Sequence, residues 1–593
     1  MLFAIHRSPT RSVRKLVIAA RVWVFAITGS NPLRFGETIS KPNSRFRRII
    51  CCGGIDPTIR VYKIIPFLGK GSQRSLRRRR KLKSQETPTM PDPASALAST
   101  QKRRLLLLHG YSAQGTDFIR WRDALAAEGI AVEMISVGNY VTLNNEVTIK
   151  DLGEAFDRAL RLAISPLNPD PHDYTWEFDA IVHSTGMLVL RQWLTGDPYT
   201  GDDPHSRIKR LKHLVGLAPA TFGSPQAAQG RSWLGALVKG SKTIGPDFLN
   251  AGDEVLLGLE LGSEYTWELS HRDLICKDPL YSKGADTPYV AVFIGNEGYG
   301  GLSALDSAPG TDGTVRWAGC ALNTRKVSVD LRRHPRLRDN DENIIKDANG
   351  NPVRIAISPW EDDRLNVPIL AIDGRDHGTM LEDPDPDAVQ RVADFLNTVD
   401  SPDAYSAWLS AAQSHSAPAL EVMKTKSVSG DLGGAGWQQF VLRVRDDHDD
   451  GIDDYNLKFF TGDTLFADDA TEINLIAKSY SADQSFRCFY VRLSDDMLTL
   501  NTENGPSTFL WIELIASSGT STIEYEAYAG TDLNPQRLAA DSEPIRLDIT
   551  SLAQGTDTLF HPFTTTMIEI FLEREPTPLN EISTLFGFLP NTA

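Results

Sequence analysis

A single serine, Ser184, stands where a strand-forming run becomes a helix. The stretch FDAIVHSTGMLVLRQWL (Phe178 to Leu194) changes from a strand pattern to a helix pattern at HSTG, with no polar spacer between them. A hydroxyl on so sharp a turn projects above the sheet, and the N–H groups that begin the following helix point into the same space. This arrangement is suited to nucleophilic attack by the serine and to binding of the oxyanion that the attack creates.

The elements around this serine alternate between short apolar runs and amphipathic runs. The main ones are the strands 105–108, 131–136, 178–182 and 213–218 and the helices 118–130, 151–164 and 185–194. Strands that alternate with helices predict a mostly parallel sheet covered by helices on both faces. Ligands bind such sheets beyond the carboxyl ends of the strands, where Ser184 is expected to lie.

The residues around Ser184 resemble the nucleophile elbow of the α/β-hydrolase family, whose pattern is G-x-S-x-G. Here the pattern reads Val182-His183-Ser184-Thr185-Gly186, so valine replaces the glycine that normally gives room where the helix crosses the strand. The stretch Leu107-Leu108-His109-Gly110-Tyr111-Ser112 is similar to the oxyanion loop of the family. The resemblance implies that the backbone N–H groups of Tyr111 and Thr185 bind the oxyanion, each worth about 3 kcal/mol in catalysis.

The resemblance covers about Arg103 to Val399 and is to the lipase/esterase-like members, in the lipase and lecithin-acyltransferase-like branch. Ala218-Pro219-Ala220-Thr221-Phe222-Gly223-Ser224-Pro225, after the strand that follows the elbow, is similar to a stretch of bacterial lipases. A β-turn explains its GSP residues equally well. We therefore interpret it as a mark of the branch and not as a site.

A serine nucleophile needs a histidine base, which a carboxylate orients. In this family the chain order is Ser, then Asp or Glu, then His. Among the 12 histidines, His377 follows an apolar strand (Val367 to Asp373) and precedes an amphipathic helix (Ala388 to Leu396), which resembles the way the family presents its base. His377 is therefore the predicted base.

The predicted acid is Asp312, which follows the strand Pro288 to Asn296. Its surroundings, PGTDGTV, resemble the lipase loop D-G-x-V that carries the catalytic aspartate, although a D-G turn is also a common structural feature. The alternative acid is Asp376, since GRDHG also resembles an acid-bearing loop. Asp376 is adjacent to His377, however, and would require a later histidine as base. No later histidine follows a parallel strand.

These residues predict a serine hydrolase that cleaves carboxylic esters, of lipid-like chemistry, through an acyl-enzyme intermediate without a cofactor. Two alternatives stay open. The same triad supports acyl transfer to an alcohol other than water. A non-catalytic binding protein on a hydrolase scaffold is the other alternative, which Val182 and the large C-terminal region favour.

The rest of the chain divides by composition. The expected divisions are a disordered basic extension (1–100), the α/β-hydrolase domain (101–400) with a leucine-rich lid insertion (226–286), a linker helix (401–425) and an accessory antiparallel β-sandwich (426–593). The helical runs of the insertion could also be extra core. Short strands separated by turn signals after about residue 427 are typical of a sandwich.

Charge and cysteine content exclude several classes of function. Residues 1–90 carry 20 Lys and Arg against 3 Asp and Glu, whereas the rest carries 42 against 73. So acidic a body argues against nucleic acid as a partner. The five cysteines form no C-x-x-C pair, so neither a disulfide framework nor a metal site is expected.

The expected partner is therefore a small-molecule or lipid ester. The lid and the basic N-terminus are the segments that could contact a membrane surface, because basic clusters bind anionic lipid. We find no clear signal peptide or transmembrane segment, and a cytoplasmic or membrane-peripheral location is favoured.

Overall fold

The computed structural model describes a set of ranges within residues 104–576. These are 104–110, 115–130, 135–140, 146–163, 174–199, 203, 205–227, 252–276, 278, 280–282, 286–299, 309–339, 341–357, 367–425, 435–493, 501–502, 505–506, 508–520, 522–528, 536–538, 542–553 and 559–576. The predicted basic extension (1–100), Tyr111 and residues 228–251 of the predicted lid lie outside them. Within these ranges, no helix is both long enough and apolar enough to cross a bilayer.

A six-stranded parallel sheet forms the centre of the α/β part of the fold. Its order is β2 (Ile135–Gly138), β1 (Arg104–Leu108), β3 (Phe178–His183), β4 (Leu211–Leu217), β5 (Tyr289–Gly295) and β8 (Ile369–Ile372), and each neighbouring pair runs parallel. Strands β3, β4 and β5 are almost wholly buried because both faces of the sheet are covered. The predicted parallel sheet is confirmed.

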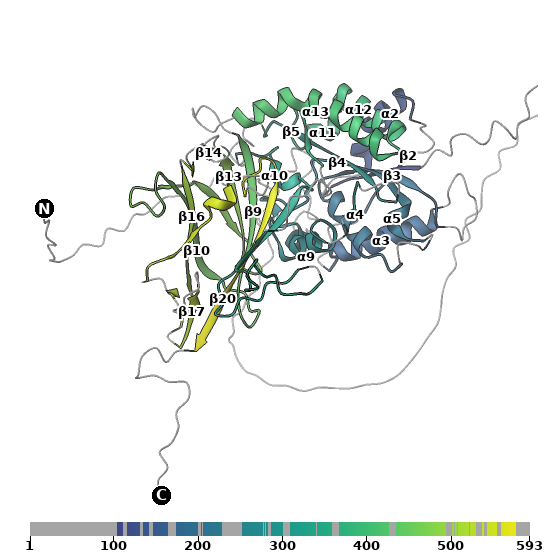
Figure 1. The fold of residues 1–593 in the computed structure, drawn as a ribbon. Helices are drawn as coiled ribbons and strands as arrows, with labels where there is room; N and C mark the ends of the chain where they lie inside the picture. Colours follow the sequence, from purple (N-terminus) through teal and green to yellow (C-terminus); the bar gives the residue numbers. More distant parts are fainter. Residues whose placement is uncertain are drawn as a thin grey trace, which may run out of the picture. The chain divides into compact units, whose positions relative to one another are not determined.

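Helices cover both faces of this sheet (Figure 1). One group contains α2 (Ile119–Ala127), α11 (Thr379–Glu382), α12 (Pro386–Thr398) and α13 (Pro402–Thr425), and the other contains α3 (Ile149–Leu162), α4 (Gly186–Thr195), α5 (Arg207–Arg210) and α9 (Glu264–Asp273). Local sequence starts two of them: Thr148 and Asp151 form a capping box before α3, and Asp385 caps α12, which begins at Pro386. The remaining short helices within the described ranges are α8 (Asp253–Leu259), α10 (Trp317–Cys320), η1 (Gly115–Phe118) and η5 (Thr550–Ala553).

Helix α13 occupies the segment predicted as a linker helix and covers the edge of the sheet. The hydroxyl of Ser416 lies 2.5 Å from the backbone nitrogen of Ala371 in β8 and also hydrogen-bonds the carbonyl oxygen of the same residue. An edge strand otherwise presents its backbone groups to new strands. The serine thus satisfies part of the edge of β8.

Two further sheets form the C-terminal region. The smaller contains β11 (Thr471–Glu472), β10 (Asp454–Gly462), β16 (Phe509–Ser517) and β19 (Ile545–Asp548). The larger contains β12 (Leu475–Ser479), β13 (Phe486–Leu493), β9 (Gly436–Asp446), β20 (Thr565–Pro576), β17 (Ile523–Ala527) and β18 (Gln536–Leu538), together with β6 (Thr324–Asp330) and β7 (Ile355–Ile357). A separate short pair consists of β14 (Asn501–Thr502) and β15 (Gly505–Pro506).

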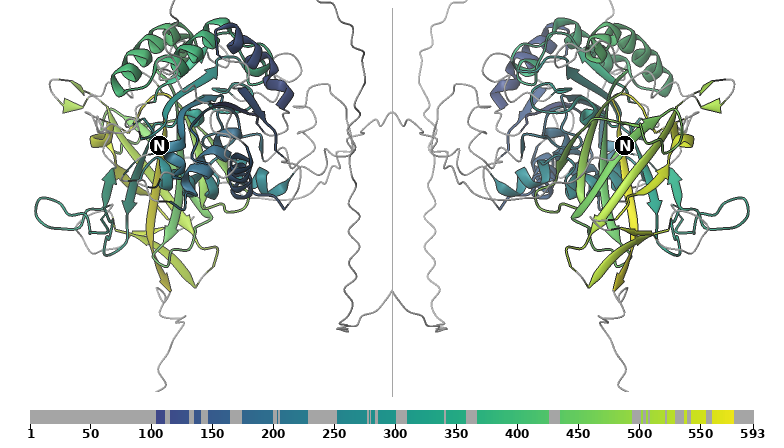
Figure 2. Two further views of the ribbon diagram at one scale, coloured as in Figure 1. Left: turned by 90° about the vertical axis from the view of Figure 1, so that its right-hand side faces the viewer. Right: turned by 90° about the vertical axis from the view of Figure 1, so that its left-hand side faces the viewer.

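The two C-terminal sheets share a hydrophobic core and form the predicted sandwich, with one difference in strand direction. Strand β20 runs parallel to both β9 and β6, whereas all pairings of the sandwich were expected to be antiparallel. Hydrophobic alternation does not encode strand direction, which depends on where the connecting chain returns to the sheet. Strand β6 also lies in the segment predicted as the hydrolase domain, and in Figure 2 this teal strand stands among green and yellow ones.

Strands β9, β13 and β20 are buried on both faces. Side chains on one face belong to the core of the parallel sheet, and they are Trp437, Val441, Phe486, Cys488, Tyr490 and Met567. Side chains on the other face belong to the core of the sandwich, and they include Phe440, Leu442, Val444, Phe489, Val491, Ile568 and Ile570. Successive residues of a strand point to opposite faces, so each strand contributes to both cores. Residues 90–593 accordingly form one compact unit, and the division into a hydrolase domain and an accessory domain stays a prediction.

The described part of the predicted lid belongs to the core. In α8 and the turn after it, Val255, Leu256, Leu259 and Leu261 are buried in the core of the parallel sheet. This burial is what the alternative of extra core would give, and the lid stays a prediction. Helix α9 is tied to α4 by a bidentate ion pair between Arg191 and Asp273, both fully buried, with N–O distances of 2.7 and 2.8 Å.

We expect Asp273→Asn to lower the free energy of unfolding by about 3 to 5 kcal/mol, because it leaves the Arg191 guanidinium buried and uncompensated. The matched control is Glu421→Gln, which removes an exposed pair with Lys424 and should change stability by no more than about 1 kcal/mol. Urea unfolding followed by circular dichroism measures both. Equal midpoints for Asp273→Asn and the wild type would contradict the expectation.

Candidate active site

Ser184 occupies a strained turn between β3 and α4. Its φ is 53°, in the left-handed region that non-glycine residues rarely adopt. Such a residue costs about 1 to 3 kcal/mol and persists only where its surroundings fix it. Here the backbone nitrogen of Ser184 donates to Leu217 at 3.2 Å, and its carbonyl accepts from Ala220 at 3.1 Å. The end of β4 thus holds the serine turn in place.

The turn fits because two glycines make room for it. A Cβ on Gly186 would lie 3.0 Å from the carbonyl oxygen of Leu108 and 3.4 Å from the Cβ of Val182. Gly186, the second glycine of the motif, therefore leaves room for the loop after β1 and for Val182, which stands at the position of the first glycine. A Cβ on Gly110 would lie 2.6 Å from the Cβ of Ser184, so the loop after β1 passes directly beside the serine side chain.

His377 and Asp312 form a buried pair. The Nδ1 of His377 lies 2.8 Å from Oδ2 of Asp312, and the backbone nitrogen of His377 donates to the carbonyl of Asp312 at 2.9 Å. The other carboxylate oxygen of Asp312 accepts from the backbone nitrogens of Thr314 and Val315 at 3.0 and 2.9 Å. A carboxylate only accepts, so Nδ1 carries the hydrogen and Nε2 of His377 is left as the basic nitrogen. This is the tautomer that a general base requires.

His183 links the serine turn to this pair. Its Nε2 donates to the carbonyl oxygen of His377 at 3.0 Å, and the two imidazole rings lie 4.5 Å apart between centroids. Burial, and after it the proximity of His377, holds the pKa of His183 well below its usual 6.5, so His183 is neutral. Because His183 directly precedes Ser184, this contact brings the serine turn and the base loop together.

Asp376 has a different role in the structure. Its Oδ1 accepts hydrogen bonds from the backbone nitrogens of Gly378 and Thr379 and from the hydroxyl of Thr379, at 2.8 to 3.0 Å. These bonds hold the turn that begins α11. The carboxylate that meets the imidazole of His377 is that of Asp312.

Comparisons with solved structures identify the fold. Phospholipase PlaB from Legionella pneumophila, alone and in complex with thio-NAD, aligns with 83% of this chain and 97% of its own length, at a TM-score of 0.59 and 19% identity. This chain has the α/β-hydrolase fold. The mature lipase BlEst2 from Bacillus licheniformis aligns with 50% of this chain and 91% of its own, at a TM-score of 0.28 and 13% identity. No family model and no curated protein matches the sequence.

In this α/β-hydrolase fold, one of the two predicted oxyanion donors can be located. Thr185 is fully buried at the N-terminal end of α4, where its carbonyl accepts from the backbone nitrogens of Leu188 and Val189. Tyr111 lies outside the described residues. Before it, His109 is stacked on Tyr140 with ring centroids 4.4 Å apart, and the Tyr140 hydroxyl donates to the His109 carbonyl at 2.6 Å. The oxyanion roles stay a prediction.

Several residues that position the site were not found from the sequence. Ser224 donates from its hydroxyl to the carbonyl of Thr314 at 2.6 Å, and the amide of Gln226 donates to Gly313 at 2.5 Å. Ser224 belongs to the stretch interpreted as a mark of the lipase branch, and Gln226 directly follows that stretch, so the resemblance was the available signal. Asn296 donates to Asp373 at 2.8 Å and accepts from Gly374 at 2.9 Å, which fixes the start of the base loop.

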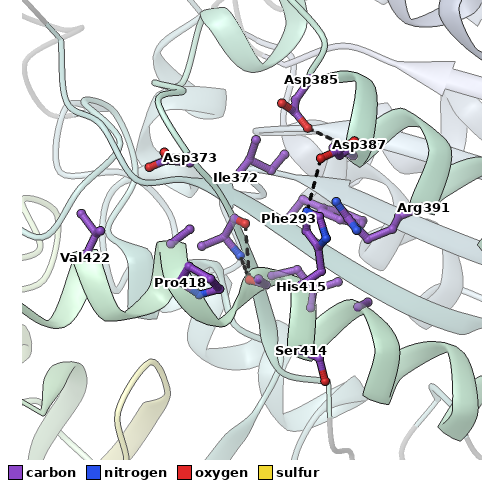
Figure 3. Close-up of a pocket in the computed structure, with 16 residues that line it drawn as sticks. Phe293, Ile372, Asp373, Asp385, Asp387, Arg391, Ser414, His415, Pro418 and Val422 are labelled. Atoms are coloured by element: carbon purple, nitrogen blue, oxygen red, sulfur yellow. Dashed lines mark hydrogen bonds and ion pairs between the residues drawn. The ribbon is translucent and has the colours of Figure 1, made fainter.

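A separate cavity of about 520 Å³ lies between the edge strand β8 and helices α12 and α13 (Figure 3). Its lining includes Ile372, Pro418 and Val422, and also Asp387 and His415, whose side-chain oxygen and nitrogen are 3.5 Å apart. None of the three predicted triad residues lines it. Within the described ranges, no group of three His, Cys, Asp or Glu side chains is arranged to bind a metal ion.

Proposed function

We propose that this chain is a serine hydrolase that cleaves carboxylic esters through an acyl-enzyme intermediate. The observation that carries the proposal is the strained Ser184, whose neighbour His183 contacts His377 of the buried pair with Asp312. Strained backbone concentrates at functional sites. A nucleophile on such a turn, next to a base that a carboxylate orients, is the arrangement on which acyl transfer depends.

In the proposed mechanism, the hydroxyl of Ser184 attacks the ester carbonyl while Nε2 of His377 takes its proton. Asp312 keeps the imidazole in the required tautomer and stabilises the imidazolium that forms. The backbone N–H groups of Tyr111 and Thr185 bind the oxyanion. His377 returns the proton to the leaving alcohol, and water activated by the same histidine then releases the acid. No step requires a cofactor.

We further propose that the substrates are lipid-like esters. Support comes from the phospholipase named among the solved structures of the same fold and from the resemblance of the sequence to lipases. Acyl transfer to an alcohol is the alternative outcome, since the same triad would catalyse it.

The test uses the full chain and p-nitrophenyl esters of increasing acyl length. We expect the enzyme to hydrolyse p-nitrophenyl acetate. We also expect kcat/KM to rise with acyl chain length by up to about fourfold per methylene, since each buried methylene contributes about 0.8 kcal/mol. If kcat/KM stayed constant or fell with chain length, the lipid-like substrate assignment would be wrong, but the proposed esterase activity would still stand. Lack of turnover together with lack of fluorophosphonate labelling would support the non-catalytic alternative. Addition of a long-chain alcohol reveals acyl transfer as an ester product.

A further inference from the structure

The loop that carries Asp312 is a tight turn with two left-handed glycines. Gly310 and Gly313, on either side of the aspartate, have φ values of 71° and 99°. A β-bridge between Thr311 and Arg316 closes the turn. Ser224 and Gln226 hold its tip from the hydrolase side, as described above. The base of the turn, at Gly310, is where the chain enters it.

The base of this turn rests on the C-terminal sheet. The hydroxyl of Tyr490, in β13, donates to the carbonyl of Gly310 at 2.6 Å, and the backbone nitrogen of Trp317 donates to the same oxygen at 3.0 Å. The rings of Tyr490 and Trp437 are stacked with centroids 4.8 Å apart. A Cβ on Gly310 would lie 2.6 Å from one ring and 2.7 Å from the other, so both rings contact the backbone directly.

The residues after Asp312 rest on the same sheet. The guanidinium of Arg316 lies 4.7 Å from the centroid of the Tyr490 ring and donates to the sulfur of Cys488 at 3.2 Å. The hydroxyl of Thr565, in β20, donates to the carbonyl of Ala318 at 3.1 Å. Tyr490 is 1% exposed, and burial raises the pKa of its hydroxyl, so it stays a proton donor throughout the working range of a histidine base.

We infer that the C-terminal sheet positions the catalytic acid, and that Tyr490 is a positioning residue that fixes Gly310 and, through it, Asp312. The inference rests on the proposed function, because it concerns the residue that orients His377. The tip and the base of the turn are held by different halves of the chain. Asp312 can therefore keep its 2.8 Å contact with His377 only while both halves hold the loop. By this inference the β-sandwich contributes no reacting group, but it holds the loop that carries the catalytic acid.

Tyr490→Phe tests this with the loss of one oxygen. The Gly310 carbonyl keeps its bond from Trp317, so the variant should fold with a melting temperature close to that of the wild type. We expect kcat to fall about tenfold, because small displacements of catalytic groups are costly, while KM stays within twofold. The matched control is Tyr455→Phe, which removes another buried tyrosine hydroxyl. This hydroxyl donates to the carbonyl of Ser485 at 3.3 Å, and Tyr455 belongs to the core of the sandwich, whereas Tyr490 belongs to the core of the parallel sheet.

A double-mutant cycle distinguishes an effect of Tyr490 on the position of Asp312 from a general destabilisation of the protein. If Tyr490 acts through Asp312, Tyr490→Phe should lower kcat by less than twofold in an Asp312→Asn background, since interacting residues are not additive. Tyr455→Phe should leave kcat unchanged in both backgrounds. Should Tyr490→Phe melt below the assay temperature, Trp437→Phe replaces it in the same cycle with the same expectation.

The outcomes are distinct. An active wild type with an unchanged Tyr490→Phe variant overturns the inference and leaves the proposed function standing. An equal loss in the Asp312→Asn background also overturns it, because the effect then does not pass through the acid. A wild type without ester turnover overturns the proposed function, and the inference with it.

Discussion

Ser184→Ala is expected to abolish ester cleavage and covalent labelling by a fluorophosphonate probe. Loss of a serine nucleophile lowers kcat by about 10⁶-fold in a serine protease triad. Alanine also has no side-chain oxygen with which the fluorophosphonate could form a phosphonate ester. Because the backbone keeps its φ of 53°, the fold should be retained. Initial rates with a p-nitrophenyl ester and mass spectrometry of the labelled peptide measure both effects.

Two further variants control this prediction. Ser410→Ala alters an exposed serine of α13 and should leave rate and labelling unchanged. Ser184→Gly should be as inactive as Ser184→Ala but more stable by about 1 kcal/mol, because glycine adopts the left-handed conformation without the penalty of a Cβ. Turnover by Ser184→Ala at the wild-type rate would refute the proposed nucleophile.

Asp312→Asn is expected to lower kcat by up to about 10⁴-fold with KM near that of the wild type. An asparagine amide can no longer hold the imidazole of His377 in the tautomer that leaves Nε2 as the base. The backbone bonds from Thr314 and Val315 to the side-chain oxygen can be kept, so the loop itself should survive. Steady-state kinetics and thermal melting together separate this from unfolding.

Asp376→Asn is the matched comparison, one residue away from His377. Its carboxylate holds the backbone nitrogens of Gly378 and Thr379, so the substitution should affect stability by about 1 kcal/mol and kcat far less than Asp312→Asn does. The reverse ranking of the two variants would assign the acid to Asp376. A new base would then have to be identified.

The parallel sheet and the serine turn were predictable because their signals are local. Buried parallel strands appear as continuous apolar runs. Where such a run becomes a helix at one serine, the serine must lie on a sharp strand-to-helix turn. The pairing of Asp312 with His377 could be anticipated from the order of strands, because loops after neighbouring parallel strands meet at one edge of the sheet. The lid stays a prediction, because apolar helical runs have the same pattern in a lid and in a core, and the buried leucines between Gly252 and Gly262 fit either.

The support of the acid loop could not be predicted from the sequence. Tyr490 and Gly310 are 180 positions apart, and no periodicity links them. A strand that is apolar on both faces, such as β13, looks the same whether its second face meets another sheet or a catalytic loop. The parallel direction of β20 and the inclusion of β6 were missed for the same reason, because both depend on the path of the whole chain.

The pairing of β20 with β6 sets an order of events during synthesis. Thr565 of β20 bonds to Ala318, 247 residues earlier, so the segment that follows the acid loop leaves the ribosome long before its neighbour exists. At translation rates of about 5 to 20 residues per second, this interval lasts at least about ten seconds. Until β20 is made, the side of β6 that pairs with it in the folded protein lacks its neighbour, and unpaired strand edges of this kind favour aggregation. The nascent chain thus completes the surroundings of its acid loop only when its final described strand has been made.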